Sequence, residues 1–408
     1  MRSPGFVVIS FSLLMVCSCR KDGPEGEAPG ITDYLTYDLV TVAVKDAGAA
    51  GFALLCKNSP AERRAASLHF LASDGMHGSP VALDALPASI EGVAFDPQDL
   101  LYTDVAVADD GTFFIVGTGT QPDQEDRLHL VVQHVDRNGT VLSEPFRRYI
   151  TTDAVVATNT GPDLQQDLHG LPRQRALCGM STNGDLIVAV RWETTAAAGI
   201  RLYRFPVGGS ASPVLRWDHT LDDHAHRLQL LTCDPVSGNT ALVMDSDGDS
   251  GHSTEIWTTS PGPSGWNQPV SATIGLIDAE PQQLVLDGSA FLLTGYRPGA
   301  DGRIYPFVCR FMDALSVAGG LRVLDGLSVA GRPVAAYCTG SWEGRADVLV
   351  QIHQASATAP YFNGDITSDL AVVRLDGQLM PSSSETIIPG QGLRAMLARE
   401  KDGRRIVI

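Results

Sequence analysis

The sequence predicts an all-β protein, and within that class a β-propeller, from three observations. Short runs of β-branched and aromatic residues recur along most of the chain. In residues 104–117, DVAVADDGTFFIVG, two such runs flank a turn rich in Asp and Gly. Hairpins of this kind return with turn glycines at positions 51, 111, 184, 238, 288, 344 and 403, and no helical period of useful length competes with them.

A repeat of this length that holds about four short strands is typical of a propeller blade. The first two strands of each repeat are the most apolar, as expected for the inner strands of a blade. The last repeat supplies only the strands 393–400 and 405–408, so we expect residues 31–37 (ITDYLTY) to pair with it and close the ring. The sequence therefore predicts seven blades of four antiparallel strands, closed by N-terminal strands on the C-terminal blade. Six blades with an irregular terminal sheet are the alternative.

The Asp-Gly turns of residues 39–408 give the chain a further likeness. The repeated sequence pattern is similar to that of bacterial propeller-type repeats, in which an ADGK-like turn precedes a strand. This resemblance implies the same repeated scaffold and carries no catalytic residue over to this sequence.

The N-terminus predicts an exported lipoprotein. A basic start and an apolar run over residues 6–16 have the length of a signal peptide. The run ends in Val-Cys-Ser-Cys, which resembles a bacterial lipobox with Cys19 as the lipidated residue, and the following Arg-Lys-Asp looks like lipoproteins of Bacteroidota-type bacteria. This predicts a signal peptide at 1–18, a tether at 19–30 and a propeller domain at 31–408. The resemblance implies a lipid anchor in the bacterial cell envelope, at the outer membrane, on either its periplasmic or its surface face.

Charge and cysteine content limit the partners of the chain. The formal net charge of −17 disfavours binding to the phosphates of nucleic acids. Five cysteines remain after Cys17 and Cys19, each in an apolar run and without the spacing of a zinc site. We expect these five to be buried thiols rather than disulfides: Cys56, Cys178, Cys233, Cys309 and Cys338.

One acidic segment predicts a metal site. Asp245, Asp247 and Asp249 alternate with small residues between the second and third strands of the fourth repeat. Such carboxylates could surround Ca²⁺, which prefers oxygen ligands, although the spacing is not that of an EF-hand. The alternative is a plain acidic hairpin loop, and Ca²⁺ is the only cofactor that the sequence suggests.

A second segment is rich in histidine. His219, Asp222, His224 and His226 lie on the connection into the fourth repeat, where propellers place ligand sites. Imidazole and carboxylate groups this close could bind zinc or another divalent ion. A solvated polar loop is the alternative, because no second metal motif supports the first.

The sequence contains no nucleophile elbow, phosphate-binding loop or dinucleotide fingerprint. We therefore expect a non-enzymatic, lipid-anchored module that binds a protein or glycan partner and no nucleic acid. The alternative is a propeller hydrolase or lyase that acts on polysaccharide, with carboxylates at the mouth of the central channel.

Overall fold

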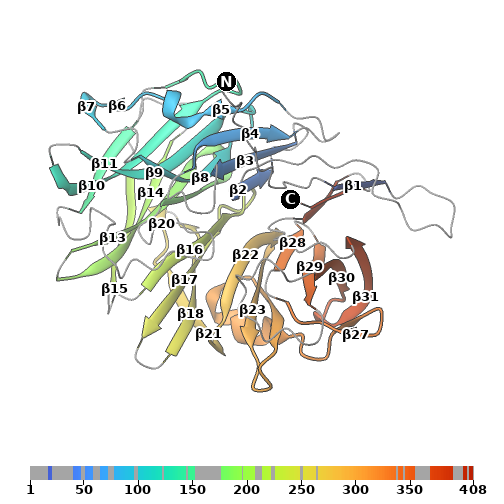
Figure 1. The fold of residues 1–408 in the computed structure, drawn as a ribbon. Coiled ribbons are helices and arrows are strands. Elements are labelled where there is room, and N and C mark those ends of the chain that lie inside the picture. The colour runs from blue at the N-terminus through green and yellow to red at the C-terminus, as the bar shows by residue number, and fades with distance from the viewer. Residues whose placement is uncertain are drawn as a thin grey trace, which may run out of the picture.

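Short apolar strands and glycine turns produce six four-stranded antiparallel sheets, which follow one another as the blades of a propeller in this computed structural model (Figure 1). Strand order follows chain order in each blade, and consecutive inner strands lie side by side around the ring. The structure describes residues 17–20, 40–46, 51–57, 65–71, 78–95, 100–121, 124–143, 146–151, 176–194, 196–206, 214–221, 226–248, 251–262, 265–336, 339–342, 345–353, 368–388, 398–401 and 404–407.

Blades 1 to 3 are built from twelve strands, and chain order within each blade runs from the inner to the outer strand. Blade 1 contains β2 (Val40–Asp46), β3 (Phe52–Lys57), β4 (Ser67–Leu71) and β5 (Val81–Ala82). Blade 2 contains β8 (Leu101–Val107), β9 (Phe113–Gln121), β10 (Gln124–Val135) and β11 (Phe146–Thr151). Blade 3 contains β12 (Ala176–Met180), β13 (Leu186–Glu193), β14 (Ala198–Phe205) and β15 (Val214–Leu221).

Blades 4 to 6 repeat the arrangement. Blade 4 contains β16 (His226–Cys233), β17 (Thr240–Gly248), β18 (Gly251–Thr259) and β21 (Val270–Ile277). Blade 5 contains β22 (Glu280–Asp287), β23 (Ala290–Pro298), β24 (Ile304–Phe311) and β25 (Leu321–Val323). Blade 6 contains β28 (Thr339–Trp342), β29 (Arg345–His353), β30 (Ser368–Leu375) and β31 (Pro381–Ile388).

The remaining elements are short. Three two-stranded hairpins lie between blade strands: β6 (Ser89–Ile90) with β7 (Val93–Ala94), β19 (Pro261–Gly262) with β20 (Gly265–Trp266), and β26 (Ser328–Val329) with β27 (Arg332–Pro333). The helical turns are η2 (Leu83–Ala85), η3 (Thr182–Gly184), η4 (Ala314–Ser316) and α2 (Val317–Gly320). Among the described residues, no helix has the length and apolar character that a bilayer crossing requires.

The propeller is confirmed, and the blade count is the alternative one, six. The seventh repeat forms a separate three-stranded sheet from β1 (Cys17–Arg20), β33 (Arg404–Val407) and β32 (Ala398–Lys401). This sheet lies between blades 1 and 6 (Figure 1). An N-terminal strand does pair with the C-terminal one, but it is Cys17–Arg20. The expected closing segment, residues 31–37, lies outside the described residues. The prediction of seven four-stranded blades is wrong because the last repeat provides only a hairpin.

The hairpin at residues 104–117 is confirmed by β8 and β9. Gly111 has a φ of 79°, in the left-handed region that favours a residue without a Cβ. Asp110 Oδ1 accepts hydrogen bonds from Thr112 N at 3.0 Å and from Thr112 Oγ1 at 2.6 Å. The acidic residues at this turn therefore stabilise the hairpin.

The core lies between blades. Because side chains alternate along a strand, each second strand packs against both of its neighbours. Ala53 and Leu55 of blade 1 pack with Phe113 and Ile115 of blade 2, and the same relation links the following blades. Even positions of a second strand thus face the next blade, and odd positions face the previous one.

An ion pair joins the inner strands of blades 1 to 3. Lys45 Nζ lies 3.3 Å from Asp104 Oδ2, and that oxygen also accepts a hydrogen bond from Cys178 N at 2.8 Å. Burial lowers the pKa of Lys45, but the Asp104 carboxylate outweighs this effect, so the pKa is raised overall. The Lys45 ammonium therefore stays charged beside Asp104.

Candidate functional site

One position in the second strand of each blade departs from the repeat. These strands contain the six-residue segments Phe52–Lys57, 113–118, 186–191, 240–245, 291–296 and 348–353. In blades 1 to 5 the first five positions are apolar or glycine, apart from Thr240 and Thr294. The sixth position is polar in every blade and different in each: Lys57, Thr118, Arg191, Asp245, Tyr296 and His353.

The first five of these side chains are buried. Lys57 and Arg191 are 0% exposed and Asp245 is 1% exposed. Each of these five residues also has a hydrogen bond, ion pair, ring contact or other electrostatic interaction. Burying a charge is costly unless a partner compensates it, so a polar residue at this position is not explained by packing of the repeat. We call the end of the ring that holds the sixth positions the entry face.

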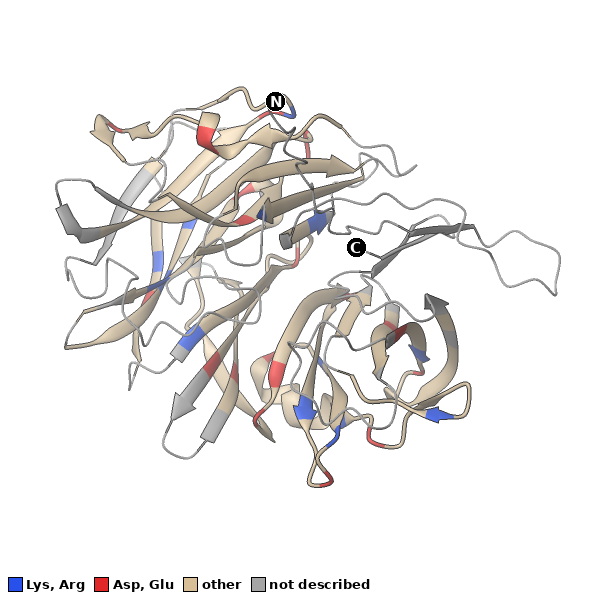
Figure 2. Cartoon of the chain, viewed as in Figure 1, with Lys and Arg blue, Asp and Glu red and all other residues tan. Residues whose placement is uncertain are grey.

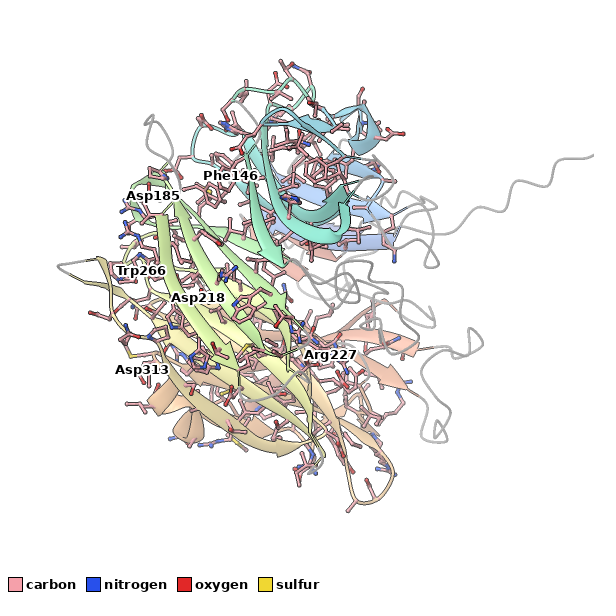
Figure 3. All side chains as sticks on the ribbon, turned by 90° about the vertical axis from the view of Figure 1, so that its left-hand side faces the viewer. Phe146, Asp185, Asp218, Arg227, Trp266 and Asp313 are labelled. Atoms are coloured by element: carbon pink, nitrogen blue, oxygen red, sulfur yellow. The ribbon has the colours of Figure 1, made fainter. Side chains whose placement is uncertain are left out.

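The entry face is opposite to the hairpin turns. Inner strands begin at the entry face and run to the turns, where the second strands start. In Figure 3, Arg227 near the start of β16 and Asp185 just before β13 lie toward opposite ends of the strands. Among the described residues, acidic and basic positions are scattered over the blades, so charge alone does not mark this face (Figure 2).

A β-bulge recurs beside the sixth position. In blades 1, 2, 4 and 5 the inner-strand partners of positions four and five are separated by one extra residue. The extra residues are Val42, Thr103, Gln229 and Gln282. A bulge re-aims side chains and bends its strand, and bulges are frequent next to active sites. Four equivalent bulges therefore shape the inner strands just below the entry face.

Blades 4 and 5 bring two carboxylates and a phenol to the entry face. Asp245 Oδ2 accepts a hydrogen bond of 2.6 Å from Nε2 of the bulge residue Gln229. Opposite Asp245 on β18, Thr254 donates its hydroxyl to the carbonyl of Ala279 at 3.1 Å. The following residue, Glu280, is half-buried and begins β22.

Glu280 is directly paired with Tyr296, the sixth position of blade 5. Side chains of directly opposed residues in an antiparallel pair lie on one face, with Cβ atoms about 5 Å apart. By the alternation of side chains, Asp245 faces blade 5, whereas Glu280 and Tyr296 face blade 6. The candidate site is therefore the entry-face end of these two neighbouring junctions, with Gln229 orienting Asp245. Sequence patterns identify only Asp245, because Glu280 and Tyr296 belong to strands whose register is not readable from local patterns.

The predicted calcium loop is largely strand. β17 extends to Gly248 and β18 starts at Gly251, so Asp245 and Asp247 lie within a paired strand and not on an open loop. Asp249 lies outside the described residues, and the side chain of Asp247 is not described. Among the described residues, no group of three His, Cys, Asp or Glu side chains could hold a metal ion. The calcium site stays a prediction, with Asp245 oriented by Gln229.

The predicted histidine site is divided between two strands. His219 lies on β15 and stacks on Trp217, with ring centroids 5.2 Å apart and an interplanar angle of 13°. It also lies 4.6 Å from Trp257 of blade 4. His219 is thus part of an aromatic contact between blades 3 and 4.

The other members of that predicted site are less well defined. His226 begins β16 and pairs with Ser246, but its side chain is not described. Asp222 and His224 lie outside the described residues. The zinc-type site therefore stays a prediction.

The cysteines are free thiols, as expected for the four described. Cys56, Cys178, Cys233 and Cys309 are buried and unpaired by disulfides, while Cys338 lies outside the described residues. Burial raises the pKa of Cys233 to about 12 and that of Cys309 to about 12. It also raises the pKa of Cys178 well above its ordinary value. These thiols stay protonated at neutral pH, so they do not supply a thiolate nucleophile.

No protein-family model matches the chain, and no curated protein matches its sequence. Solved structures match in fold. A protein of unknown function from Dyadobacter fermentans is 11% identical, with a TM-score of 0.46 over 93% of this chain and 100% of that one. The GH93 alpha-L-arabinofuranosidase of Fusarium graminearum is 11% identical, with a TM-score of 0.39 over 76% of this chain and 86% of that one.

The acylaminoacyl peptidase of Pyrococcus horikoshii is 9% identical, with a TM-score of 0.41 over 76% of this chain, which spans only 42% of that enzyme. These neighbours include hydrolytic enzymes, which goes against the expectation of a non-enzymatic binding or scaffold module, and the hydrolase alternative is taken as a proposal below. At this similarity they describe the fold, and no substrate or residue role passes from them to this chain.

Proposed function

We propose that this chain is a hydrolase that cleaves glycosidic bonds at the entry face. The observation that carries the proposal is the presence of Asp245, Glu280 and Tyr296 at the same end of the neighbouring blades 4 and 5. Glycoside hydrolysis commonly needs two carboxyl groups beside the scissile bond, one to transfer a proton and one to act on the sugar carbon or on water. The thiols of Cys178, Cys233 and Cys309 have raised pKa values and stay protonated, and the proposal therefore assigns the reacting groups to the carboxylates.

The two carboxylates have different surroundings. Asp245 is buried and fixed by the Gln229 amide, which suits the group that must keep one orientation during the reaction. Glu280 is half-buried and faces Tyr296, which suits the group that exchanges a proton with substrate and water. The phenol of Tyr296 would then hold or polarise the substrate beside Glu280.

The proposal is tested by incubating the purified protein with a panel of neutral and acidic polysaccharides and aryl glycosides. We expect new reducing ends from at least one substrate. The same assay on Asp245→Asn should show loss of that release with the fold intact by circular dichroism. Release of reducing ends that is unchanged in Asp245→Asn, or absent from the whole panel, would contradict the proposal.

We also propose that the chain is exported and anchored by a lipid on Cys19 in the bacterial outer membrane. The lipobox-like Val-Cys-Ser-Cys and the polar residues after it support this. In the uncut chain, Cys17–Arg20 pairs with β33. Cleavage before Cys19 would remove half of that strand, so processing would change the sheet beside blade 6. A protein that stays in the membrane fraction after Cys19→Ala would contradict the anchor.

The two metal sites that the sequence suggests are proposals with direct tests. Ca²⁺ binding near Asp245, Asp247 and Asp249 should appear in isothermal titration calorimetry and disappear in Asp247→Asn. Binding of Zn²⁺ through His224 and His226 should be lost in His226→Gln. The absence of heat with either ion would contradict the corresponding site.

A further inference from the structure

The junction between blades 5 and 6 differs from the other junctions in the middle of the second strand. Position four of the second strand is Leu55, Val116, Ala189 and Val243 in blades 1 to 4, but Thr294 in blade 5. Position four faces the next blade, so this hydroxyl points into the junction with blade 6.

Packing around β23 confirms that direction. Leu292, two residues before Thr294 on the same face, packs with Val348 and Val350 of blade 6. The Thr294 hydroxyl therefore enters a junction whose other walls are formed by blade 6.

Blade 6 adds two hydroxyls from the opposite side. Thr339 pairs with Val350, and Ser341 pairs with Val348. Directly opposed side chains share a face, so Thr339 and Ser341 face blade 5 with those valines. Blade 5 adds the amide of Gln283, which is paired with Thr294 and accepts a hydrogen bond of 2.7 Å from Ser341 N. Four polar side chains from two blades thus converge in one junction.

The three hydroxyls are buried, and no protein group in the described residues satisfies them. The exposed fractions are 0% for Thr294, 1% for Thr339 and 0% for Ser341. Within the described part of the chain, none of these three hydroxyl oxygens has a hydrogen-bond partner. At two other junctions, threonine hydroxyls donate to the next blade at 2.7 Å, Thr103 to Ala176 O and Thr232 to Leu284 O. Buried polar groups in native proteins nearly always have a partner, often an ordered water.

We propose that the junction of blades 5 and 6 is a binding site for a small cluster of ordered water molecules. The hydroxyls of Thr294, Thr339 and Ser341 can each donate and accept, and Gln283 Oε1 has a second lone pair to offer. Water, which also donates and accepts, satisfies such a set. A hard divalent cation would instead need carboxylates, and this set is neutral.

A crystal structure of the protein at high resolution tests the site directly. We expect solvent density within hydrogen-bond distance of at least two of the three hydroxyls, in every copy of the chain. A dry junction would overturn the proposal. Density with the short contacts and high coordination of a metal ion would overturn it in favour of a cation site.

A stability measurement gives an independent answer. If water bridges the hydroxyls, Thr294→Val leaves it without an anchor, and the melting temperature should fall by about 2 °C. If the junction is dry, the same change removes an unsatisfied hydroxyl, and the melting temperature should rise, which would overturn the proposal. Val243→Thr is the matched control, because it places a hydroxyl at the same position of blade 4 among apolar neighbours, where it should lower the melting temperature.

Discussion

At the residue scale, the inner ring depends on charges that compensate one another. Lys45 and Asp104 come from different blades, and the Asp104 side chain is 5% exposed. Removing one partner of a buried ion pair is more destabilising than replacing both partners, because it leaves a buried charge uncompensated. The ion pair thus fixes the relation of blades 1 to 3, together with the hydrogen bond from Cys178 N to Asp104.

We expect Asp104→Asn to lower the free energy of unfolding by about 2–3 kcal/mol, because Lys45 then keeps its charge without a carboxylate. Urea denaturation measures this loss. Asp218→Asn is the control, because Asp218 forms an exposed pair with Arg201 on blade 3 and should cost at most about 1 kcal/mol. Equal losses of unfolding free energy in the two variants would show that the buried pair stabilises the protein no more than the exposed pair does.

His134 gives stability a pH dependence. Burial lowers the pKa of His134, and the nearby Asp110 carboxylate offsets this only in part. The folded-state pKa is therefore below the unfolded value of about 6.5, so the stabilising contribution is complete above about pH 6.5 and is lost as the pH falls below it. Between pH 7.5 and pH 5.5, each about one unit from the unfolded pKa, the free energy of unfolding should decrease. This decrease should be larger in the native protein than in His134→Gln. Parallel pH curves would refute this role.

The candidate site shows what single residues reveal in a sequence. Asp245 stands out because it begins a run of three carboxylates at alternate positions, and it was predicted as a site residue for that reason. Glu280 does not stand out in the sequence. It is a candidate because it pairs with Tyr296 and follows Ala279, whose carbonyl contacts the neighbouring blade. Those contacts are set by strand register and blade order, and neither is encoded locally.

At the element scale, the second strand is the unit that the sequence describes best. Its apolar positions and the positive φ of turn glycines such as Gly184 and Gly238 are local properties, and the second strands of the first six repeats were predicted from them. The recurrent bulge was not predicted. An extra residue in an inner strand changes which side chains face which blade, but it leaves the apolar pattern almost unchanged.

Gly295 lies opposite the bulge of blade 5 and keeps β22 close to β23. A Cβ on Gly295 would lie 2.3 Å from Glu280 O and 2.6 Å from a ring carbon of Phe307. We expect Gly295→Ala to lower the free energy of unfolding by about 2 kcal/mol, because backbone must move to make room. Hydrolysis should fall as well, since Glu280 moves with its strand.

Calorimetric melting and the reducing-end assay measure both effects of Gly295→Ala. Gly326→Ala is the matched control, because an added Cβ there meets no atom within 4 Å. If Gly295→Ala is as stable and active as Gly326→Ala, neither stability nor hydrolysis depends on the close approach of the two strands.

At the scale of the whole molecule, the propeller class was predictable and the number of blades was not. Repetition reveals the class, because each hairpin repeats the same apolar pattern. Closure depends on pairing between the two ends of the chain, where β1 meets β33. Such long-range pairing leaves no periodic signal, so residues 393–408 resembled another blade, although β32 and β33 belong to a three-stranded sheet.

Hydrolysis at the entry face of blades 4 and 5 is the function that the whole ring would support. Its sharpest test is the kcat of Glu280→Gln on the best substrate of the panel, with Asp218→Asn as a control carboxylate away from the site. We predict a decrease of about 10²–10⁴-fold for Glu280→Gln, with an unchanged melting temperature, and a kcat near that of the native protein for Asp218→Asn. Equal kcat values for the native protein and Glu280→Gln would contradict the assignment of this site.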